Sequence, residues 1–226
     1  MPNSTCRIVW GMRIALPSIM SPITKFAVVI GSTRPNRVGP LIARWVLNIL
    51  QANEAWQNID FSILDLASFS LPSFNEPTHP MMIKNLDHFS SPTVIAWNQE
   101  IAKFDAYILI SPEYHSGIPG ALKNAIDFLY VAWTGKPVMI LTYGVFGGAH
   151  ANSQLRQVLE LGCRMQVASI DCRLEFPGRN EEQNNTSPAL FQAMAGNIET
   201  ETFDFWKDKE DQVLSGAREM LASRGI

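Results

Sequence analysis

Two loops of this 226-residue chain carry side chains suited to binding a charged ligand with a flat ring. Each loop follows an apolar run and leads into a helical pattern, so each is predicted at the carboxyl end of a buried strand. The first loop covers residues 31–37 and the second covers residues 111–119. Because ligands of open α/β sheets bind at the carboxyl ends of the strands, the pair predicts a site for a phosphate-bearing cofactor.

The first loop, Gly31-Ser-Thr-Arg-Pro-Asn-Arg37, has the composition of a phosphate site. Backbone N–H groups at a helix start favour an anion. The Ser32 hydroxyl can donate a hydrogen bond, and Arg34 and Arg37 can form charge-assisted bonds with phosphate oxygens. The loop contains neither GxxxxGK[ST] nor GxGxxG, which argues against a nucleoside triphosphatase and against a standard dinucleotide fold. A phosphate monoester is the favoured ligand, and a helix cap with two solvated arginines is the alternative.

The second loop is expected to face the first across a cleft. Pro112 stiffens it, and Tyr114 offers a flat apolar face for packing. We interpret Glu113 as a solvated or capping carboxylate rather than a general acid, because nothing in the sequence indicates a perturbed pKa. His115 can donate to a ring atom or titrate near neutrality, and a structural histidine explains it equally well.

A third loop, Tyr143-Gly-Val-Phe-Gly-Gly148, follows another apolar run. Glycines Gly144, Gly147 and Gly148 would let the backbone approach a flat ligand closely, although an ordinary strand-to-helix turn has the same composition. The sequence has no GxSxG nucleophile elbow, and its histidines form no metal-ligand set. We therefore assign no catalytic side chain and no metal, and expect the cofactor to carry the chemistry.

Apolar runs alternate with helical patterns along the chain. The predicted strands are 26–30, 59–64, 106–110, 138–142 and 165–170. Helices are predicted from the helical periodicity of residues 38–50 and 93–104. Two more are predicted to begin at Pro119 and after Gly148, and a last one covers 203–222. Residues 67–92 and 175–187 are predicted to be mostly irregular. The alternation indicates a doubly wound parallel sheet, with either the dinucleotide strand order or the flavodoxin-like order 2-1-3-4-5.

Composition narrows the class of protein. A net charge of −3 argues against a general nucleic-acid binder, and no apolar run is long enough to span a bilayer. Cys6, Cys163 and Cys172 form no CxxC motif, which suits a reducing compartment. Residues 1–24 are basic and are interpreted as a disordered or packed extension; their weak resemblance to a transit peptide is the alternative. We expect a cytoplasmic protein, or a mitochondrial one if this extension is a targeting segment.

Residues 31–39, 111–127 and 143–148 resemble the NADPH-dependent FMN reductase family, the flavodoxin-like group that includes yeast-type quinone reductases and azoreductases. The likeness covers about residues 25–173, and the run Pro119-Gly-Ala-Leu-Lys-Asn-Ala-Ile-Asp127 is highly specific. The resemblance implies an α/β flavodoxin-like three-layer sandwich over residues 25–226, with a five-stranded parallel sheet of order 2-1-3-4-5. It also implies bound FMN, NADPH or NADH as hydride donor, and a homodimer or homotetramer. The implied reaction reduces quinones, azo compounds, flavins or related acceptors by two-electron ping-pong transfer.

Carried over by position, the FMN phosphate would be held by Ser32, Arg34 and Arg37. The isoalloxazine ring would be lined by Pro112, Glu113, Tyr114 and His115, where the family usually has Asn in place of His115. The other edge would be closed by Tyr143, Gly144, Gly147 and Gly148. Two other functions stay open: a protein-binding or regulatory module controlled by the flavin's redox state, suggested by the irregular segment 67–92, and a flavodoxin-type electron carrier, disfavoured by the mild net charge.

Overall fold

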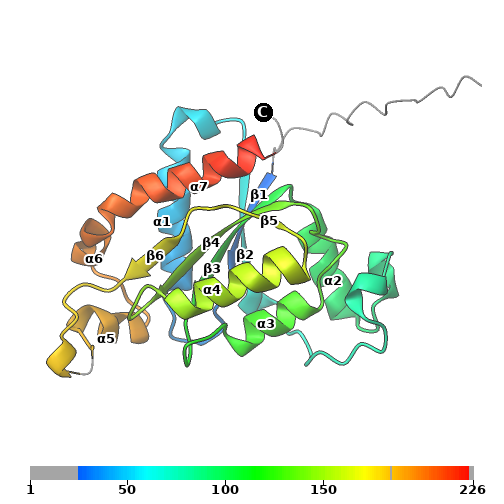
Figure 1. The fold of residues 1–226 in the computed structure, drawn as a ribbon, viewed down its shortest axis with the longest axis horizontal. Coiled ribbons are helices and arrows are strands. Elements are labelled where there is room, and N and C mark those ends of the chain that lie inside the picture. The colour runs from blue at the N-terminus through cyan, green and yellow to red at the C-terminus, as the bar shows by residue number, and fades with distance from the viewer. Residues whose placement is uncertain (1–24, 184, 224–226) are drawn as a thin grey trace, which may run out of the picture.

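A twisted parallel β-sheet runs through the centre of the molecule, with helices on both faces (Figure 1). The computed structural model describes residues 25–183 and 185–223, so the predictions for residues 1–24 lie outside the described part. The strands are β1 (Lys25–Ile30), β2 (Asp60–Asp65), β3 (Ala106–Pro112), β4 (Pro137–Gly144), β5 (Gln166–Val167) and β6 (Cys172–Glu175). Their order is β2-β1-β3-β4-β5, with β6 also paired to β4. The predicted flavodoxin-like fold class and strand order 2-1-3-4-5 are confirmed.

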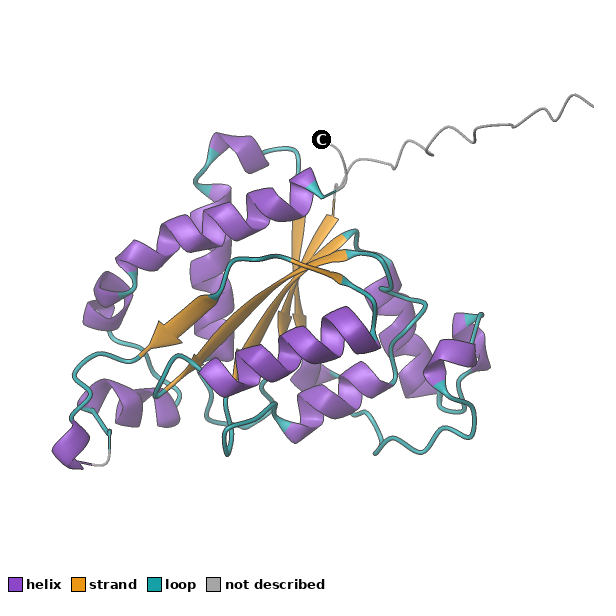
Figure 2. Ribbon diagram, in the orientation of Figure 1, coloured by secondary structure: helices purple, strands orange, loops and turns teal. Residues whose placement is uncertain are grey.

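The central strands are apolar on both faces because each face packs against helices (Figure 2). One core holds Val28 and Ile30 of β1 with apolar residues of α1 (Gly39–Gln51) and α7 (Glu210–Ala222). The other holds Ala27 and Val29 with residues of α2 (Pro92–Ala102), α3 (Gly120–Asp127) and α4 (Ala149–Gln157). Alternation along the strand therefore divides the side chains between two helical layers, which gives the three-layer sandwich.

The fifth strand differs from its prediction over 165–170. β5 pairs with residues 137–138 of β4, and β6 pairs with residues 141–144 of the same strand. Between them, the Ser169 N–H donates to the Glu219 carboxylate of α7 at 2.7 Å. The Ala168 carbonyl accepts from Arg156 at 3.0 Å. Because these backbone groups bond to side chains, the ladder is interrupted after β5. Only residues 166–167 of the predicted strand pair with β4, and β6 lies beyond the predicted range.

The carboxyl-terminal region also differs from the single helix predicted over 203–222. It contains α5 (Pro188–Met194), α6 (Thr200–Phe205), a 3₁₀ turn (Lys207–Lys209) and α7. The break falls at Trp206, whose buried ring lies against Trp45, Phe176 and Phe203. Burying this large side chain, which also donates to the Glu175 carbonyl, outweighs the continuation of the helix. The sequence prediction had no counterpart of α5.

Residues 67–92 are mostly irregular, as predicted, with short 3₁₀ turns at Leu66–Ser68, Pro80–Met82 and Leu86–His88. An additional 3₁₀ turn, Glu54–Trp56, precedes β2, a π-helical turn, Val158–Gly162, extends α4, and another 3₁₀ turn covers Glu181–Gln183. Over the described ranges, no helix combines the length and apolar character needed to cross a bilayer.

Candidate functional site

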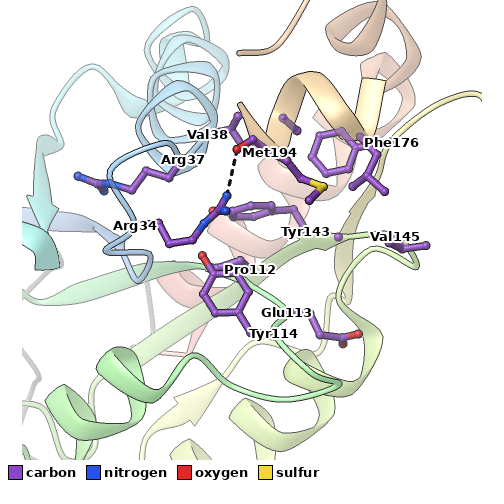
Figure 3. Close-up of a pocket in the computed structure, with 13 residues that line it drawn as sticks. Arg34, Arg37, Val38, Pro112, Glu113, Tyr114, Tyr143, Val145, Phe176 and Met194 are labelled. Atoms are coloured by element: carbon purple, nitrogen blue, oxygen red, sulfur yellow. Dashed lines mark hydrogen bonds between the residues drawn. The ribbon is translucent and has the colours of Figure 1, made fainter. Parts of the chain in front are cut away.

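The three predicted loops meet at one edge of the sheet and border a cavity of about 260 Å³ (Figure 3). They follow β1, β3 and β4, whose carboxyl ends lie side by side because the strands are parallel neighbours. Seven predicted site residues line the cavity: Arg34, Arg37, Pro112, Glu113, Tyr114, Tyr143 and Gly144. The other four, Ser32, His115, Gly147 and Gly148, belong to the same loops but do not line it.

The first loop turns sharply at Gly31, whose N–H donates to the Ile110 carbonyl at 2.8 Å. A Cβ at Gly31 would come within 2.7 Å of Leu122, and one at Gly39 within 2.5 Å of Ser32 Oγ. The two glycines thus allow the loop to pack tightly over the sheet. Ser32 Oγ is fully buried and has no hydrogen-bond partner among the described residues. A buried hydroxyl of this kind is available to a ligand oxygen at the loop.

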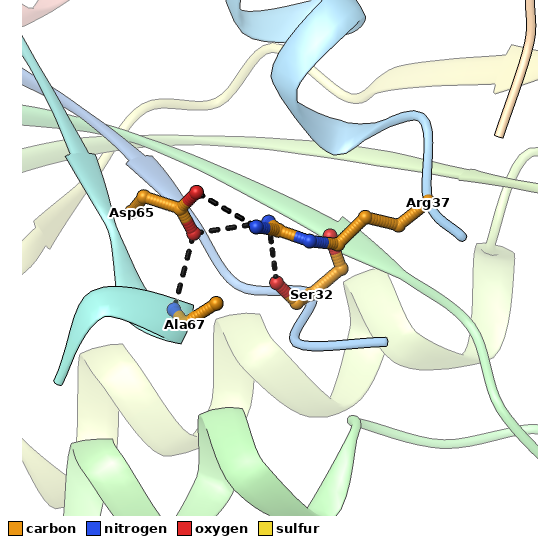
Figure 4. A network of polar contacts seen from close by, with 4 residues as sticks. All are labelled: Ser32, Arg37, Asp65 and Ala67. Carbon is orange, nitrogen blue, oxygen red and sulfur yellow. Dashed lines mark hydrogen bonds and ion pairs between the residues drawn. The ribbon is translucent and has the colours of Figure 1, made fainter. Parts of the chain in front are cut away.

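Arg37 is held in place by an ion pair (Figure 4). Its Nη1 and Nη2 donate to the two carboxylate oxygens of Asp65 at 2.9 and 2.8 Å. Nη1 also donates to the Ser32 carbonyl at 2.9 Å. Asp65 stands at the end of β2 and accepts from the Ala67 N–H at 3.1 Å. The guanidinium therefore ties the first loop to the neighbouring strand.

Arg34 has a different environment from Arg37. Its side chain is exposed, with Nη2 3.4 Å from the Met194 carbonyl at the end of α5. Its guanidinium carbon lies 5.9 Å from the ring centroid of Tyr114. A carbonyl and an aromatic face do not neutralise a cation, so Arg34 leaves one end of the cavity positively charged.

Glu113 caps helix α4. Its Oε2 accepts from the backbone N–H groups of His150 and Ala151, at 2.8 and 2.9 Å. A carboxylate at a helix amino terminus satisfies orphan donors and interacts favourably with the helix dipole. The capping interpretation of Glu113 made from the sequence is therefore confirmed, and this contact fixes the second loop against the third.

His115 occupies a tight turn rather than the cavity wall. Tyr114 and Gly117 exchange two backbone hydrogen bonds at 3.0 and 3.1 Å, and His115 and Ser116 between them have φ of 50° and 55°. This is the left-handed pattern of a type I′ turn, which Asn and Gly adopt most easily. The exposed His115 side chain lies outside the cavity lining, so its structural interpretation fits better than a contact with a ring.

Gly147 and Gly148 determine the backbone path of the third loop. Both have left-handed backbones, with φ of 63° and 71°. A Cβ at Gly147 would lie 2.7 Å from Arg173 Cβ, and one at Gly148 would lie 2.9 Å from Thr142 Cβ. The Thr142 hydroxyl donates to the Gly147 carbonyl at 2.7 Å. Glycine at these positions lets the chain fold back and start α4, while Gly144 reaches the cavity itself.

Tyr143 places a protonated phenol at the cavity wall. Burial raises the pKa of Tyr143 to about 12, and the nearby Tyr114 adds to this. The Ser32 hydroxyl, Arg37 and Arg34 act in the opposite direction. Ser32 lies close enough to influence this pKa, although its oxygen does not meet hydrogen-bond geometry. Tyr143 is consequently neutral at physiological pH and can act as a hydrogen-bond donor.

The remaining part of the cavity wall was not predicted from the sequence. It is apolar and consists of Val38, Val145, Phe176, Leu190, Ala193 and Met194. The last three belong to α5, whose end contacts Arg34 of the first loop. The dipeptide Ser187-Pro188 was an available signal for this helix, because Ser187 accepts from the Leu190 N–H at 3.1 Å and Pro188 occupies the first turn.

The fold and the site together define a flavodoxin-like α/β protein with a cavity at the carboxyl ends of its central strands. Residues 24–171 match the family model described as NADPH-dependent FMN reductase. An NAD(P)H-dependent FMN reductase of Nectria sp is 39% identical over 154 residues, covering 68% of this chain and 76% of the relative. Another from Schizosaccharomyces pombe is 35% identical over 178 residues, covering 78% and 86%.

Among solved structures, a flavoenzyme NAD(P)H:(acceptor) oxidoreductase from Paracoccus denitrificans superposes with a TM-score of 0.59 at 21% identity, covering 88% of this chain and 97% of that one. This likeness supports the fold. The chain belongs to the NADPH-dependent FMN reductase family. It is therefore an FMN-dependent oxidoreductase with NAD(P)H as electron donor, and the sequence prediction of an enzyme is confirmed.

The residues present fit FMN. The cavity has a cationic end at Arg34, as a phosphate requires. In the same loop, the buried Ser32 hydroxyl does not line the cavity but has no hydrogen-bond partner among the described residues. The rest of its wall is mainly apolar and aromatic, with Tyr114, Tyr143 and Phe176, as a flat ring system requires.

Proposed function

We propose that the chain holds FMN in this cavity and reduces quinones, azo compounds, flavins or related small-molecule acceptors with NAD(P)H. One observation carries the proposal: the loops after β1, β3 and β4 join a positively charged end to an apolar, aromatic wall in a single cavity. That combination matches a phosphate joined to a tricyclic ring, and it does not match a purely anionic or purely apolar ligand.

At the phosphate end, Ser32 and Arg34 are the proposed direct ligands. The Ser32 hydroxyl lacks another partner, and the exposed Arg34 guanidinium has only a carbonyl and a ring nearby. We assign Arg37 a positioning role, in which its bonds to Asp65 and to the Ser32 carbonyl hold the loop in its binding shape.

At the ring end, Pro112, Tyr114 and Gly144 supply the contact surface. Glu113 contributes by anchoring the second loop to α4, and His115 contributes through the turn that presents Tyr114. Gly147 and Gly148 give the third loop its shape. The neutral Tyr143 phenol provides a hydrogen-bond donor beside the apolar residues of the wall.

Bound FMN would supply the redox chemistry, taking two electrons from NAD(P)H and passing them to the acceptor. The chain's own residues position the reactants and exclude water. Val145 and Phe176, which line the cavity on the side away from Arg34, form the apolar surface where the nicotinamide and then the acceptor would lie. Because both would use the same position, they must bind in turn, which is the ping-pong order. Positioning of this kind lowers the barrier without a proton-transferring side chain.

Purification from a flavin-sufficient host tests the proposal. We expect a yellow protein whose flavin absorbance is bleached by anaerobic NADPH and restored by a quinone. Initial rates at several fixed quinone concentrations should give parallel double-reciprocal lines. A protein that stays colourless after incubation with FMN would refute the binding site, and intersecting lines would refute the ping-pong order.

We also propose that the enzyme is a homodimer or homotetramer. The supporting feature is a hollow of about 630 Å³ between the Pro80–Met82 turn, α3 and the end of α4. Exposed apolar side chains lie at its edge, including Phe74, Met81 and Leu161, the last of which is 73% exposed. Patches of this kind mark association surfaces. Sedimentation equilibrium should give a multiple of the chain mass of 25.2 kDa, and the mass of a single chain would refute this proposal.

A cytoplasmic location is proposed as well. Cys163 and Cys172 are free and buried, and burial raises their pKa to about 11 and about 12. Unpaired, unreactive thiols suit a reducing compartment.

A further inference from the structure

A second cation, Arg179, belongs to the segment that follows the cavity residue Phe176. The guanidinium carbon of Arg179 is 4.8 Å from the ring centroid of Phe146. Both side chains are exposed, and 43% of Phe146 is accessible to solvent. An arginine stacked on an exposed aromatic ring is pre-organised, because the ring limits the conformations of a long, flexible side chain.

The pair adjoins the cavity rim through both of its loops. Phe146 directly follows Val145, and Arg179 comes three residues after Phe176. Val145 and Phe176 line the cavity on the side away from Arg34 (Figure 3). Phe146 and Arg179 therefore belong to two segments that border the cavity on this side, and a ligand leaving the cavity here would pass along these segments.

Arg179 has unused binding capacity. No carboxylate in residues 25–183 or 185–223 forms an ion pair with it, whereas Arg37, Arg156 and Arg173 are each paired with an acid. The guanidinium lies over the Phe146 ring, and no carboxylate among the described residues binds its N–H donors. A guanidinium can bind two oxygens of a phosphate and can also stack on a planar base.

The adenosine end of NADPH offers both of these groups, a purine ring and a 2′-phosphate. NADH has the purine but lacks the 2′-phosphate. The nicotinamide has to reach the cavity where we place the flavin. The Arg34 side is covered by α5 and is assigned to the FMN phosphate. The rest of the dinucleotide would then leave over the Val145 and Phe176 rim.

We propose that Arg179, held on Phe146, binds the 2′-phosphate of NADPH and makes this enzyme select NADPH over NADH. The inference rests on the proposed FMN function of the cavity. Arg179 is a specificity-determining residue in this account, and it takes no part in FMN binding.

The test compares Arg179→Ala with a matched control, Arg218→Ala, which removes the same charge from an exposed position on α7. In the FMN-loaded enzyme, kcat/KM is measured with NADPH and with NADH. Loss of a charge-assisted phosphate contact should lower the value for NADPH roughly 10- to 100-fold and leave that for NADH within about twofold. The control should change neither value. Arg179→Lys keeps the positive charge but loses the planar guanidinium that can bind two phosphate oxygens. Its kcat/KM with NADPH should therefore lie between those of wild type and Arg179→Ala.

Calorimetric binding of 2′,5′-ADP and 5′-ADP gives a readout that does not depend on turnover. Wild type should bind 2′,5′-ADP more tightly, and Arg179→Ala should bind the two alike. If Arg179→Ala fails to fold, the same comparison on Arg179→Lys decides the question. The inference is overturned if wild type uses both nucleotides equally, if the substitution lowers both rates in proportion, or if 2′,5′-ADP binds no better than 5′-ADP. A wild-type protein that oxidises neither nucleotide would instead refute the proposed function.

Discussion

The ion pair between Arg37 and Asp65 separates two explanations of the first loop. If the pair holds the loop in place, removing either partner should harm both stability and FMN binding. If Arg37 instead binds the phosphate directly and pairs with Asp65 only while FMN is absent, removing the Asp65 carboxylate should leave Arg37 free to bind the phosphate. The informative substitutions are therefore Arg37→Ala and Asp65→Asn.

The expected loss of stability follows from the contacts. Arg37 makes three hydrogen bonds, two of them to a carboxylate, and the two side chains are 14% and 27% exposed. A hydrogen bond to a charged group contributes about 1.5–3 kcal/mol, and partial exposure reduces the sum of such terms. We expect Arg37→Ala to lower the free energy of unfolding by about 2–3 kcal/mol, which is a fall of roughly 4–12 °C in Tm for a domain of this size.

Two assays follow from this. Denaturant unfolding of the FMN-free protein measures stability, with Lys103→Ala as the control. Lys103 forms an ion pair with Glu100 on α2 and is 60% exposed, so its removal should change stability by less than about 1 kcal/mol. Fluorescence titration measures the FMN dissociation constant. If ordering the loosened loop costs about 1 kcal/mol of binding free energy, this constant should rise roughly fivefold or more in both Arg37→Ala and Asp65→Asn.

The sign of the Asp65→Asn effect decides between the explanations. Weaker FMN binding supports a loop held in place by the pair. Equal or tighter binding in Asp65→Asn, together with weaker binding in Arg37→Ala, would refute that account and make Arg37 a direct phosphate ligand. A loss in Arg37→Ala no larger than the Lys103→Ala control would show that the pair does not stabilise the fold.

Three further outcomes are expected. Arg34→Ala should weaken FMN binding by about 1.5–3 kcal/mol without lowering the Tm of the FMN-free protein, because the side chain is exposed; an unchanged dissociation constant would remove Arg34 from the site. Glu113→Ala should cost about 1–2 kcal/mol of stability through loss of the α4 cap, while NADPH oxidation by the FMN-loaded enzyme persists; a collapse of kcat at unchanged stability would instead identify a general acid. Burial raises the pKa of Cys163 from 9.0 to about 11, so the unfolded thiol ionises first and stability should fall as pH rises from about 9 to about 11. Cys163→Ala should reduce that fall in denaturant titrations, and an identical pH profile would contradict the assignment.

The elements that position the site were predictable because local signals agreed with the tertiary arrangement. β1, β3 and β4 read as apolar runs since both of their faces are buried, and the loops that follow them contain the Gly, Ser, Arg and Pro residues that such junctions need. The sequence left Glu113 as either a solvated or a capping carboxylate; the helix that it caps, α4, begins more than 30 residues further along the chain, so this contact depends on the tertiary structure.

What could not be predicted depends on partners far away in the chain. Asp65 is 28 residues from Arg37, so the spacing of the first loop alone could not show that its second arginine is already bound. The interruption of the fifth strand depends on Glu219, which lies 50 residues beyond Ser169. The apolar wall contributed by α5 combines a short helix with a tertiary contact to the first loop, and only its Ser187-Pro188 start has a local signal.

A crystal structure of the FMN complex tests the central claim most directly. The account predicts one FMN in each chain, with its phosphate bonded to Ser32 Oγ and Arg34 and its ring beside Tyr114. In that structure Arg37 should still be paired with Asp65. A cavity that remains empty in crystals grown with FMN, or a phosphate bound outside the loop of residues 31–37, would contradict the account.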